Sequence, residues 1–211
     1  MKRDIDAVVF DLYGTLVHVT DERRPYRRLF RRLALPLFFN SLGRKEIRNI
    51  CLTEELLSLS AVVERLLPYK KDLDLRKYDA ELAREVGSVE LYPDTLSTLE
   101  MLKSRGVKLG MISNLASPYK EPFFRLGLDR YISDPVFSCD VGMIKPEKDI
   151  YRLALDRLGV SAERALMVGD RLMNDVLGPA SVGMRGLFLD RDCSSSYIVK
   201  IDCLSQIYSN L

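Results

Sequence analysis

The sequence lacks several features that mark particular classes of protein. Its four cysteines form no CxxC pair and only one histidine, His18, could join them, so we do not expect a zinc site. Scattered cysteines of this kind suit a reducing compartment, and we expect a cytoplasmic protein. No apolar run approaches the roughly 18 residues of a membrane span, and the first such run ends at Asp11, too early for a signal peptide. The net charge of +2 indicates no general affinity for polyanions.

The apolar residues that are present occur in short, nearly continuous runs. Four of them read IDAVVF, VKLGMIS, ALMVG and RGLFLD. Runs of this length and composition are typical of strands that are buried on both faces of a parallel sheet. With 47% apolar and 29% charged residues in a chain of 211, the sequence therefore predicts an ordinary globular core.

Helical patterns separate these runs. Residues 95–105 place Leu96, Leu99 and Leu102 on one face, and residues 150–158 show a similar pattern; a glycine follows each segment, as at many helix ends. Strands that alternate with helices favour an α/β fold in which a doubly wound parallel sheet has helices on both faces.

One long segment, residues 18–90, breaks this alternation and reads as helices only. Within it, apolar residues recur at a 4-3-4-3 spacing that predicts one amphipathic helix ending before Pro68: Leu52, Leu56, Leu59, Val63 and Leu66. We therefore expect a helical insertion in a core that is formed by residues 1–17 and 91–211.

An arginine-rich stretch, RRPYRRLFRRL, lies near the start of this insertion. Its apolar residues fall on one half of a helix and its arginines on the other, namely Arg23, Arg24, Arg27, Arg28, Arg31 and Arg32. Such a face can follow the phosphates of a nucleic acid, but a solvated face is the favoured interpretation. A third interpretation is that some of these arginines attract an anionic small-molecule substrate.

Polar side chains follow the predicted strands at the point where each one ends. Asp11 follows the first strand, Ser113 and Asn114 follow the second, and Lys145 comes after the run VFSCDVGMI. Asp170 follows ALMVG, with Asp175 five residues later. In open α/β sheets ligands bind beyond the carboxyl ends of the strands, so we expect these groups to converge there. Each alone has an ordinary structural explanation as a turn or helix cap; together they predict a catalytic site.

The segments DLYGTL, ISN, IKPEKDIY and VGDRLMND resemble the four ordered motifs of the haloacid dehalogenase-like hydrolase superfamily. The resemblance covers both ends of the predicted core, and the helical insertion resembles the superfamily's cap. It implies a Rossmann-like parallel sheet and a hydrolase. The motifs identify the superfamily and leave the substrate open.

The resemblance also implies a metal-dependent site. Asp11 would be the nucleophile, forming a covalent aspartyl intermediate that water hydrolyses. Mg²⁺ suits the oxygen ligands that Asp11, the main-chain carbonyl of Tyr13, and Asp170 would supply, with Asp175 nearby.

Further roles follow for the neighbouring residues. Lys145 would neutralise the nucleophile and the phosphate, while Ser113 and Asn114 would hydrogen-bond the oxygens of the transferring group. Gly14 allows the sharp turn after the strand, and the hydroxyl of Thr15 is expected to brace the loop by hydrogen bonds.

Tyr13 stands where phosphatases of this superfamily have an aspartate that serves as general acid and base. The 2-haloacid dehalogenases resemble this chain in having tyrosine there, because halide leaves without a proton, yet they need no metal and have serine where this chain has Asp170. Two retained metal carboxylates favour a Mg²⁺-dependent phosphatase of a small phosphomonoester. A metal-free dehalogenase, with Arg44 as a candidate cap arginine, and a non-catalytic homologue are the alternatives. His18 is a candidate for the missing base, although a loop histidine without a role is the favoured interpretation.

Overall fold

The computed structural model describes residues 5–33, 41–68 and 73–210. Within them one sheet has the strand order β5-β4-β1-β6-β7-β8, and every pairing in it is parallel. Its strands are β1 (Ala7–Phe10), β4 (Lys108–Ser113), β5 (Val136–Phe137), β6 (Ala165–Gly169), β7 (Arg185–Leu189) and β8 (Lys200–Ile201). The four runs expected as strands thus form β1, β4, β6 and β7, and the predicted α/β fold is confirmed.

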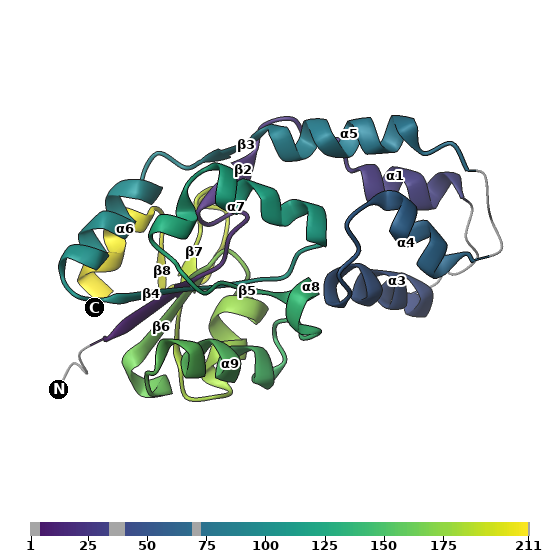
Figure 1. The fold of residues 1–211 in the computed structure, drawn as a ribbon. Helices are drawn as coiled ribbons and strands as arrows, with labels where there is room; N and C mark the ends of the chain where they lie inside the picture. Colours follow the sequence, from purple (N-terminus) through teal and green to yellow (C-terminus); the bar gives the residue numbers. More distant parts are fainter. Residues whose placement is uncertain (1–4, 34–40, 69–72, 211) are drawn as a thin grey trace.

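Helices cover both faces of this sheet (Figure 1). Successive side chains of a strand point to opposite faces, and β1 is buried on both: Val8 and Phe10 pack with α6 (Thr95–Ser104) and α7 (Glu121–Arg125). On the other face Ala7 and Val9 pack with α9 (Lys148–Leu158). This double burial explains the unbroken apolar runs in the sequence.

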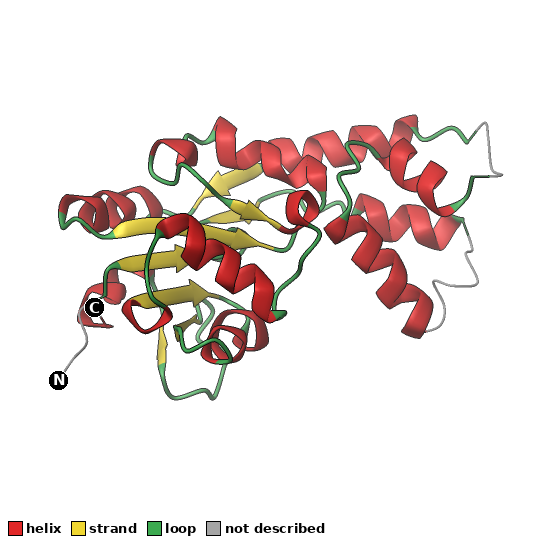
Figure 2. Ribbon diagram, turned by 60° about the horizontal axis from the view of Figure 1, so that its bottom comes forward, coloured by secondary structure: helices red, strands yellow, loops and turns green. Residues whose placement is uncertain are grey.

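The helices α1 (Pro25–Arg32), α3 (Ser41–Thr53), α4 (Leu59–Leu66) and α5 (Arg76–Gly87) lie together beside the sheet, and we call them the helical unit. Figure 2 shows this unit at one end of the molecule, away from the sheet. Two short antiparallel strands, β2 (Val17–Val19) and β3 (Val89–Leu91), carry the chain out to the unit and back.

The remaining short elements are η1 (Ser117–Lys120), η2 (Leu128–Arg130), α8 (Ser138–Val141), η3 (Ala162–Arg164), the π-helical turn η4 (Leu172–Leu177), α10 (Gly178–Ala180) and η5 (Leu204–Asn210). Among the described helices, none is both long and apolar enough to cross a membrane.

The helical expectation for residues 52–66 was wrong in one respect, because α3 ends at Thr53 and α4 begins only at Leu59. The side-chain hydroxyl of Ser58 accepts the Ala61 N–H and begins the second helix. The expectation that residues 18–90 hold helices only was also wrong, since β2 and β3 lie at its two ends.

Two smaller expectations also differ from the structure. Leu96 is exposed, whereas Leu99 and Leu102 are fully buried as expected. Of the run VFSCDVGMI, only Val136 and Phe137 form a strand, after which the chain turns into α8.

The arginine-rich stretch forms α1, whose apolar side, with Leu29 and Phe30, is buried. The opposite side of the helix carries four arginines, and Arg23 and Arg24 directly precede it. Several have partners: Arg23 pairs with Asp21, Arg24 with Glu22 and Arg28 with Glu81, while Arg32 lies over the ring of Tyr78. Carboxylates therefore offset much of the positive charge that a nucleic acid would need.

Candidate active site

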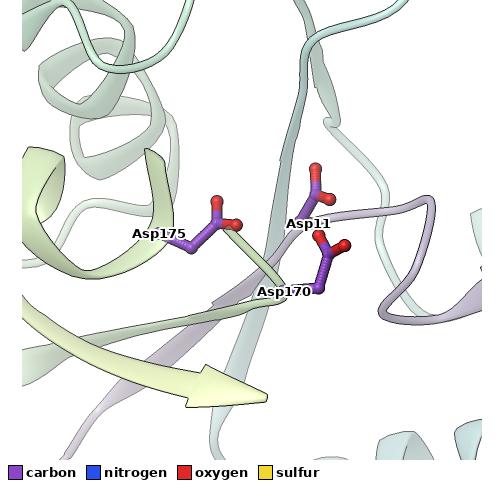
Figure 3. Close-up of side chains that lie close together, drawn as sticks. All are labelled: Asp11, Asp170 and Asp175. Carbon is purple, nitrogen blue, oxygen red and sulfur yellow. The ribbon is translucent and has the colours of Figure 1, made fainter. Parts of the chain in front are cut away.

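Three carboxylates meet at the carboxyl edge of the sheet (Figure 3). Asp11 follows β1, Asp170 follows β6, and Asp175 lies in η4; one oxygen from each lies within 4.8 Å of the others. The first two meet because β1 and β6 pair in parallel, so both strands end at the same level. The chain continues from β1 to β4 on one side and later to β6 on the other, and the site lies at this switch point.

Lys145 lies under these carboxylates, almost fully buried. Its Nζ is 2.8 Å from Asp11 Oδ1 and 2.6 Å from Asp175 Oδ1. Burial alone would lower the pKa of Lys145, but the two carboxylates outweigh it and raise that pKa. Burial raises the pKa of Asp175 to about 6, against the effect of Lys145 and with that of Asp11. The ammonium group of Lys145 thus contacts two carboxylates, and the cluster has an excess of negative charge.

Asp170 shows this excess most directly. Its Oδ1 is buried and has no hydrogen-bond partner among the described residues, while Arg171 approaches only the other oxygen, at 3.4 Å. Burial and then the charge of Asp11 raise the pKa of Asp170. A buried carboxylate oxygen without a partner is costly, and a set of carboxylate oxygens is what a hard divalent cation takes as ligands. The residues present therefore fit such an ion.

The loop after β1 is shaped to pass close to Asp170. Gly14 has φ +80°, and a Cβ at this position would lie 2.5 Å from Asp170 Oδ2. Glycine is therefore required here both for its backbone conformation and for space. The expected bracing by Thr15 is not seen, since its buried hydroxyl has no partner among the described residues. Instead the Thr15 carbonyl oxygen accepts a hydrogen bond from Arg191, 2.7 Å away.

The turn that carries Asp175 is held by the carboxylate itself. Asp175 Oδ2 accepts the main-chain N–H of Arg171 at 2.9 Å, and the Asp175 N–H donates to the Arg171 carbonyl oxygen at 2.7 Å. A Cβ on Gly169 would lie 2.4 Å from Asp175 Cγ, so this strand end must also be glycine. Single π-helical turns of this kind are frequent at functional sites.

Asn114 makes contacts that the sequence did not predict. Its amide Nδ2 donates to the Lys145 carbonyl oxygen at 2.9 Å, and its Oδ1 accepts the Lys145 N–H at 2.8 Å. This reciprocal pair fixes the backbone from which the lysine side chain rises, so the side-chain amide has a positioning contact. Ser113, at the end of β4, is buried beside it.

The Tyr13 side chain has its hydroxyl engaged outside the carboxylate cluster. The hydroxyl donates to the main-chain carbonyl oxygen of Tyr119 at 3.0 Å, and the two rings meet edge to face with centroids 5.9 Å apart. Burial, followed by the charges of Glu121 and Glu85, raises the pKa of Tyr13 far above its ordinary value. This phenol is a poor proton donor for a reaction at Asp11.

A cavity of about 360 Å³, which we call the site pocket, opens over the cluster. It is lined by Asp11, Tyr13, Arg48, Ser113, Asn114, Lys145, Asp170, Arg171 and Asn174. Arg48 was not predicted from the sequence and is brought to the pocket by α3. Its place four residues after Arg44, on the same helical face, was the available signal. His18 is not among these residues and packs against Tyr92, with ring centroids 4.7 Å apart.

A second cavity of about 430 Å³, which we call the apolar chamber, lies between the core and the helical unit. It is lined by Tyr13, Val19, Tyr26, Phe30, Arg44, Ile47, Arg48, Cys51, Leu52, Asn114, Leu115, Ala116 and Tyr119. Three of these residues, Tyr13, Arg48 and Asn114, also line the site pocket, so the two cavities adjoin.

Residues 5–183 match the family model of haloacid dehalogenase-like hydrolases. The chain belongs to this family. It is 30% identical over 202 residues to glyceraldehyde 3-phosphate phosphatase of Pyrococcus furiosus, covering 87% of this chain and 80% of that protein. The corresponding protein of Methanothermobacter thermautotrophicus is 37% identical over 106 residues, which are 50% of this chain and 47% of that one. This chain thus matches about half the length of several curated relatives.

The crystal structure of a phosphatase of the same family from Thermococcus onnurineus superposes with a TM-score of 0.68 at 27% identity. The superposition covers 98% of this chain and 97% of that one. The helical unit is therefore part of an arrangement that this family member shares, and the chain belongs to the haloacid dehalogenase-like hydrolase family in sequence and in fold.

Proposed function

We propose that this hydrolase is a Mg²⁺-dependent phosphatase of small phosphomonoesters and that Asp11 is its nucleophile. The observation that carries the proposal is the carboxylate cluster. In it Asp170 has a buried oxygen with no partner in the described part of the chain, and Asp175 shares its lysine with Asp11. Asp11, the main-chain carbonyl of Tyr13, and Asp170 would hold the ion, with Asp175 beside it. The ion, when bound, supplies positive charge that lets a carboxylate approach a phosphate dianion.

The residues around Asp11 serve a phosphate in other ways. Asp11 attacks phosphorus, the bond to the ester oxygen breaks, and water then releases inorganic phosphate and restores the carboxylate. Lys145 holds the nucleophile in place, and Arg48 and Arg171 bring positive charge to the same pocket. Ser113 lines the same pocket, and its hydroxyl would hydrogen-bond the oxygens of the transferring phosphoryl group. The phosphatase names of the similar proteins support a phosphate ester as substrate.

The proposal extends to the domain organisation and the cellular location. Residues 18–90 serve as a cap over a core of residues 1–17 and 91–211, because the helical unit supplies Arg48 to the site pocket. All four cysteines are free thiols, which supports a cytoplasmic location.

A panel of phosphomonoesters assayed with Mg²⁺, with EDTA, and with the Asp11→Asn variant tests the function. We expect inorganic phosphate release that needs both the metal and Asp11. No release above the variant from any ester would refute it. A phosphate-releasing activity that depends on Asp11 would also exclude a non-catalytic binding protein.

A metal-free 2-haloacid dehalogenase is the second candidate, and Tyr13 favours it because its side chain replaces the usual acid. The Asp170 oxygen that has no partner among the residues described speaks against it, since that reaction needs no cation at the site. Halide release from L-2-chloropropionate in EDTA, lost in Asp11→Asn, would establish this activity in place of the phosphatase.

A further inference from the structure

We propose that the substrate is the phosphate ester of an apolar aryl alcohol and that its ring lies in the apolar chamber. This inference rests on the proposed phosphatase function and specifies the substrate class of the same site. Two separate features carry it: the composition of the chamber, and the hydrogen bond that occupies the hydroxyl of Tyr13.

The chamber is a continuation of the site. Tyr13, Arg48 and Asn114 line both cavities, so an ester whose phosphate lies at Asp11 can extend its alcohol part into the chamber. A phosphate alone fills little of the combined space. The chamber, at about 430 Å³, is then the place for the alcohol part of the ester.

Apart from Arg44, Arg48 and Asn114, the chamber walls are apolar and aromatic. Tyr26 and Phe30 of α1 have ring centroids 6.2 Å apart, and Tyr26 and Tyr119 are separated by 6.1 Å. Ile47 of α3 and Leu115 of the core complete opposite sides. Rings in such a setting pack against a further ring by edge-to-face or offset contacts. A polyhydroxylated alcohol would exchange its hydrogen bonds to water for contacts with carbon, which is unfavourable.

The chemistry of the leaving group points to the same class. The hydroxyl of Tyr13 donates to Tyr119, and the other described residues that line the site pocket include no histidine, glutamate or cysteine to protonate a leaving alkoxide. Its two aspartates, Asp11 and Asp170, are the nucleophile and an ion ligand of the proposed function, and Lys145 is paired with carboxylates. A phenol has a pKa of about 10, as in tyrosine, whereas an alkanol resembles water, at about 15.7. An aryl oxide therefore leaves without a proton from the protein, and an alkoxide does not.

The proposed step balances without a further reactant. One oxygen of Asp11 forms a bond to phosphorus, the bond from phosphorus to the aryl oxygen breaks, and the aryl oxide departs with the electron pair and takes a proton from water. Water then attacks the aspartyl phosphate, which yields inorganic phosphate and the free carboxylate of Asp11. The products are a phenol and phosphate.

A set of esters separates the effect of the apolar chamber from the effect of the leaving group. We compare kcat/KM for 1-naphthyl, phenyl, cyclohexyl and ethyl phosphate and for glyceraldehyde 3-phosphate, all with Mg²⁺. We expect 1-naphthyl above phenyl phosphate because of the larger apolar body, and phenyl above cyclohexyl phosphate because of the leaving group. Each step is expected to be about tenfold or more.

Variants that fill the chamber test where the ring lies. Ala116→Leu on the core side and Leu52→Phe on α3 each add carbon to the chamber. We expect each to lower the ratio of kcat/KM for 1-naphthyl phosphate to that for ethyl phosphate by about tenfold. Ala83→Leu, at an exposed position of α5, is the control and should leave the ratio unchanged. Melting temperatures show whether each variant is folded, and the two filling variants approach the chamber from different sides.

The outcomes are distinguishable. If ethyl phosphate or glyceraldehyde 3-phosphate exceeds the aryl esters, or if both folded filling variants keep the wild-type ratio, the aryl inference is wrong while the phosphatase function stands. If no ester is hydrolysed above Asp11→Asn, the phosphatase proposal fails. In that case ligand binding still tests whether the chamber takes an aryl ring. 1-Naphthylphosphonate should raise the melting temperature more than ethylphosphonate, and equal shifts would show that the chamber does not bind the ring.

Discussion

The hydroxyl of Tyr13 donates a hydrogen bond to the main-chain carbonyl oxygen of Tyr119, across 3.0 Å and 106 positions of sequence. The side chain that replaces the usual acid of the family's phosphatases is thus held by the segment after β4. Its contribution is to position the loop beside Asp11 and to form the wall that the site pocket shares with the apolar chamber.

Replacing Tyr13 separates these roles. Tyr13→Phe removes one hydrogen bond and is expected to lower the free energy of unfolding by about 1 kcal/mol, with less than a threefold change in kcat for aryl phosphates.

Tyr13→Asp introduces a carboxyl group that can protonate the leaving oxygen, so kcat should rise for alkyl esters and change little for aryl esters. Plots of log kcat against leaving-group pKa measure both: the slope should be steep in wild type and in Tyr13→Phe, and flatter in Tyr13→Asp. An equally steep slope in Tyr13→Asp would show that another group donates the proton.

Gly14 offers a direct test of the loop geometry. In Gly14→Ala the new Cβ would lie 2.5 Å from Asp170 Oδ2, in a backbone region that costs a non-glycine residue roughly 1–2 kcal/mol. We expect a lower melting temperature and a loss of kcat of more than tenfold. Gly87→Ala is the matched control because a Cβ there meets nothing within 4 Å, and it should be neutral or stabilising. Equal effects of the two substitutions would contradict the packing of Gly14 on Asp170.

Asp170→Asn is expected to stabilise the metal-free protein while it abolishes Mg²⁺ binding. The pKa of Asp170 is raised in the folded state, first by burial and then by Asp11, against the attraction of Arg171 and Lys145. The loss of folding free energy that this causes is absent at a pH where the carboxyl is protonated in both the folded and the unfolded state. It grows as the pH rises through the ordinary and then the raised pKa, and it is complete above the raised pKa. Melting curves in EDTA should therefore show a higher melting temperature for the variant than for wild type at pH 7, and little difference at pH 3.5.

Addition of Mg²⁺ should reverse this order at pH 7, because only the wild type binds the ion and is stabilised by it. A wild type that is insensitive to Mg²⁺ at this pH would remove the metal from the proposed function.

Arg48 is expected to contribute to phosphate binding. Arg48→Gln should raise KM by about tenfold with a smaller change in kcat, since a hydrogen bond to a charged group contributes roughly 1.5–3 kcal/mol. Arg44→Gln is the comparison, because Arg44 lines the chamber but not the site pocket. Its effect on KM should be smaller, and the KM of wild type should rise with salt more steeply than that of Arg48→Gln. Identical KM values for wild type and Arg48→Gln would contradict this role.

The residues at the strand ends were predictable because a buried parallel strand has a strong local pattern, and Asp11 and Asp170 each interrupt one. The same local logic failed between Leu52 and Leu66. There the 4-3-4-3 spacing continues through a break, and the break depends partly on a distant contact, the N–H of Leu56 with the hydroxyl of Ser117 at 3.0 Å.

Other features depend on the fold and have no local signature. The pairing of Asn114 with the backbone of Lys145 joins positions 31 residues apart. Strands β2 and β3 are three residues each, too short to show an alternating pattern. The apolar chamber exists only because helices α1 and α3 lie against the core.

Tyr119 is held at two points. Its carbonyl oxygen accepts from Tyr13, and its hydroxyl donates to Glu85 of α5 at 2.5 Å. The same buried carboxylate accepts the main-chain N–H groups of Arg23 and Arg24 at the start of α1. A swing of the helical unit that carries α5 away from the sheet must therefore break this contact or pull on Tyr119, and through it on the loop beside Asp11. One tyrosine thus links the position of α5, in the helical unit that forms part of the chamber wall, to the position of the loop beside Asp11.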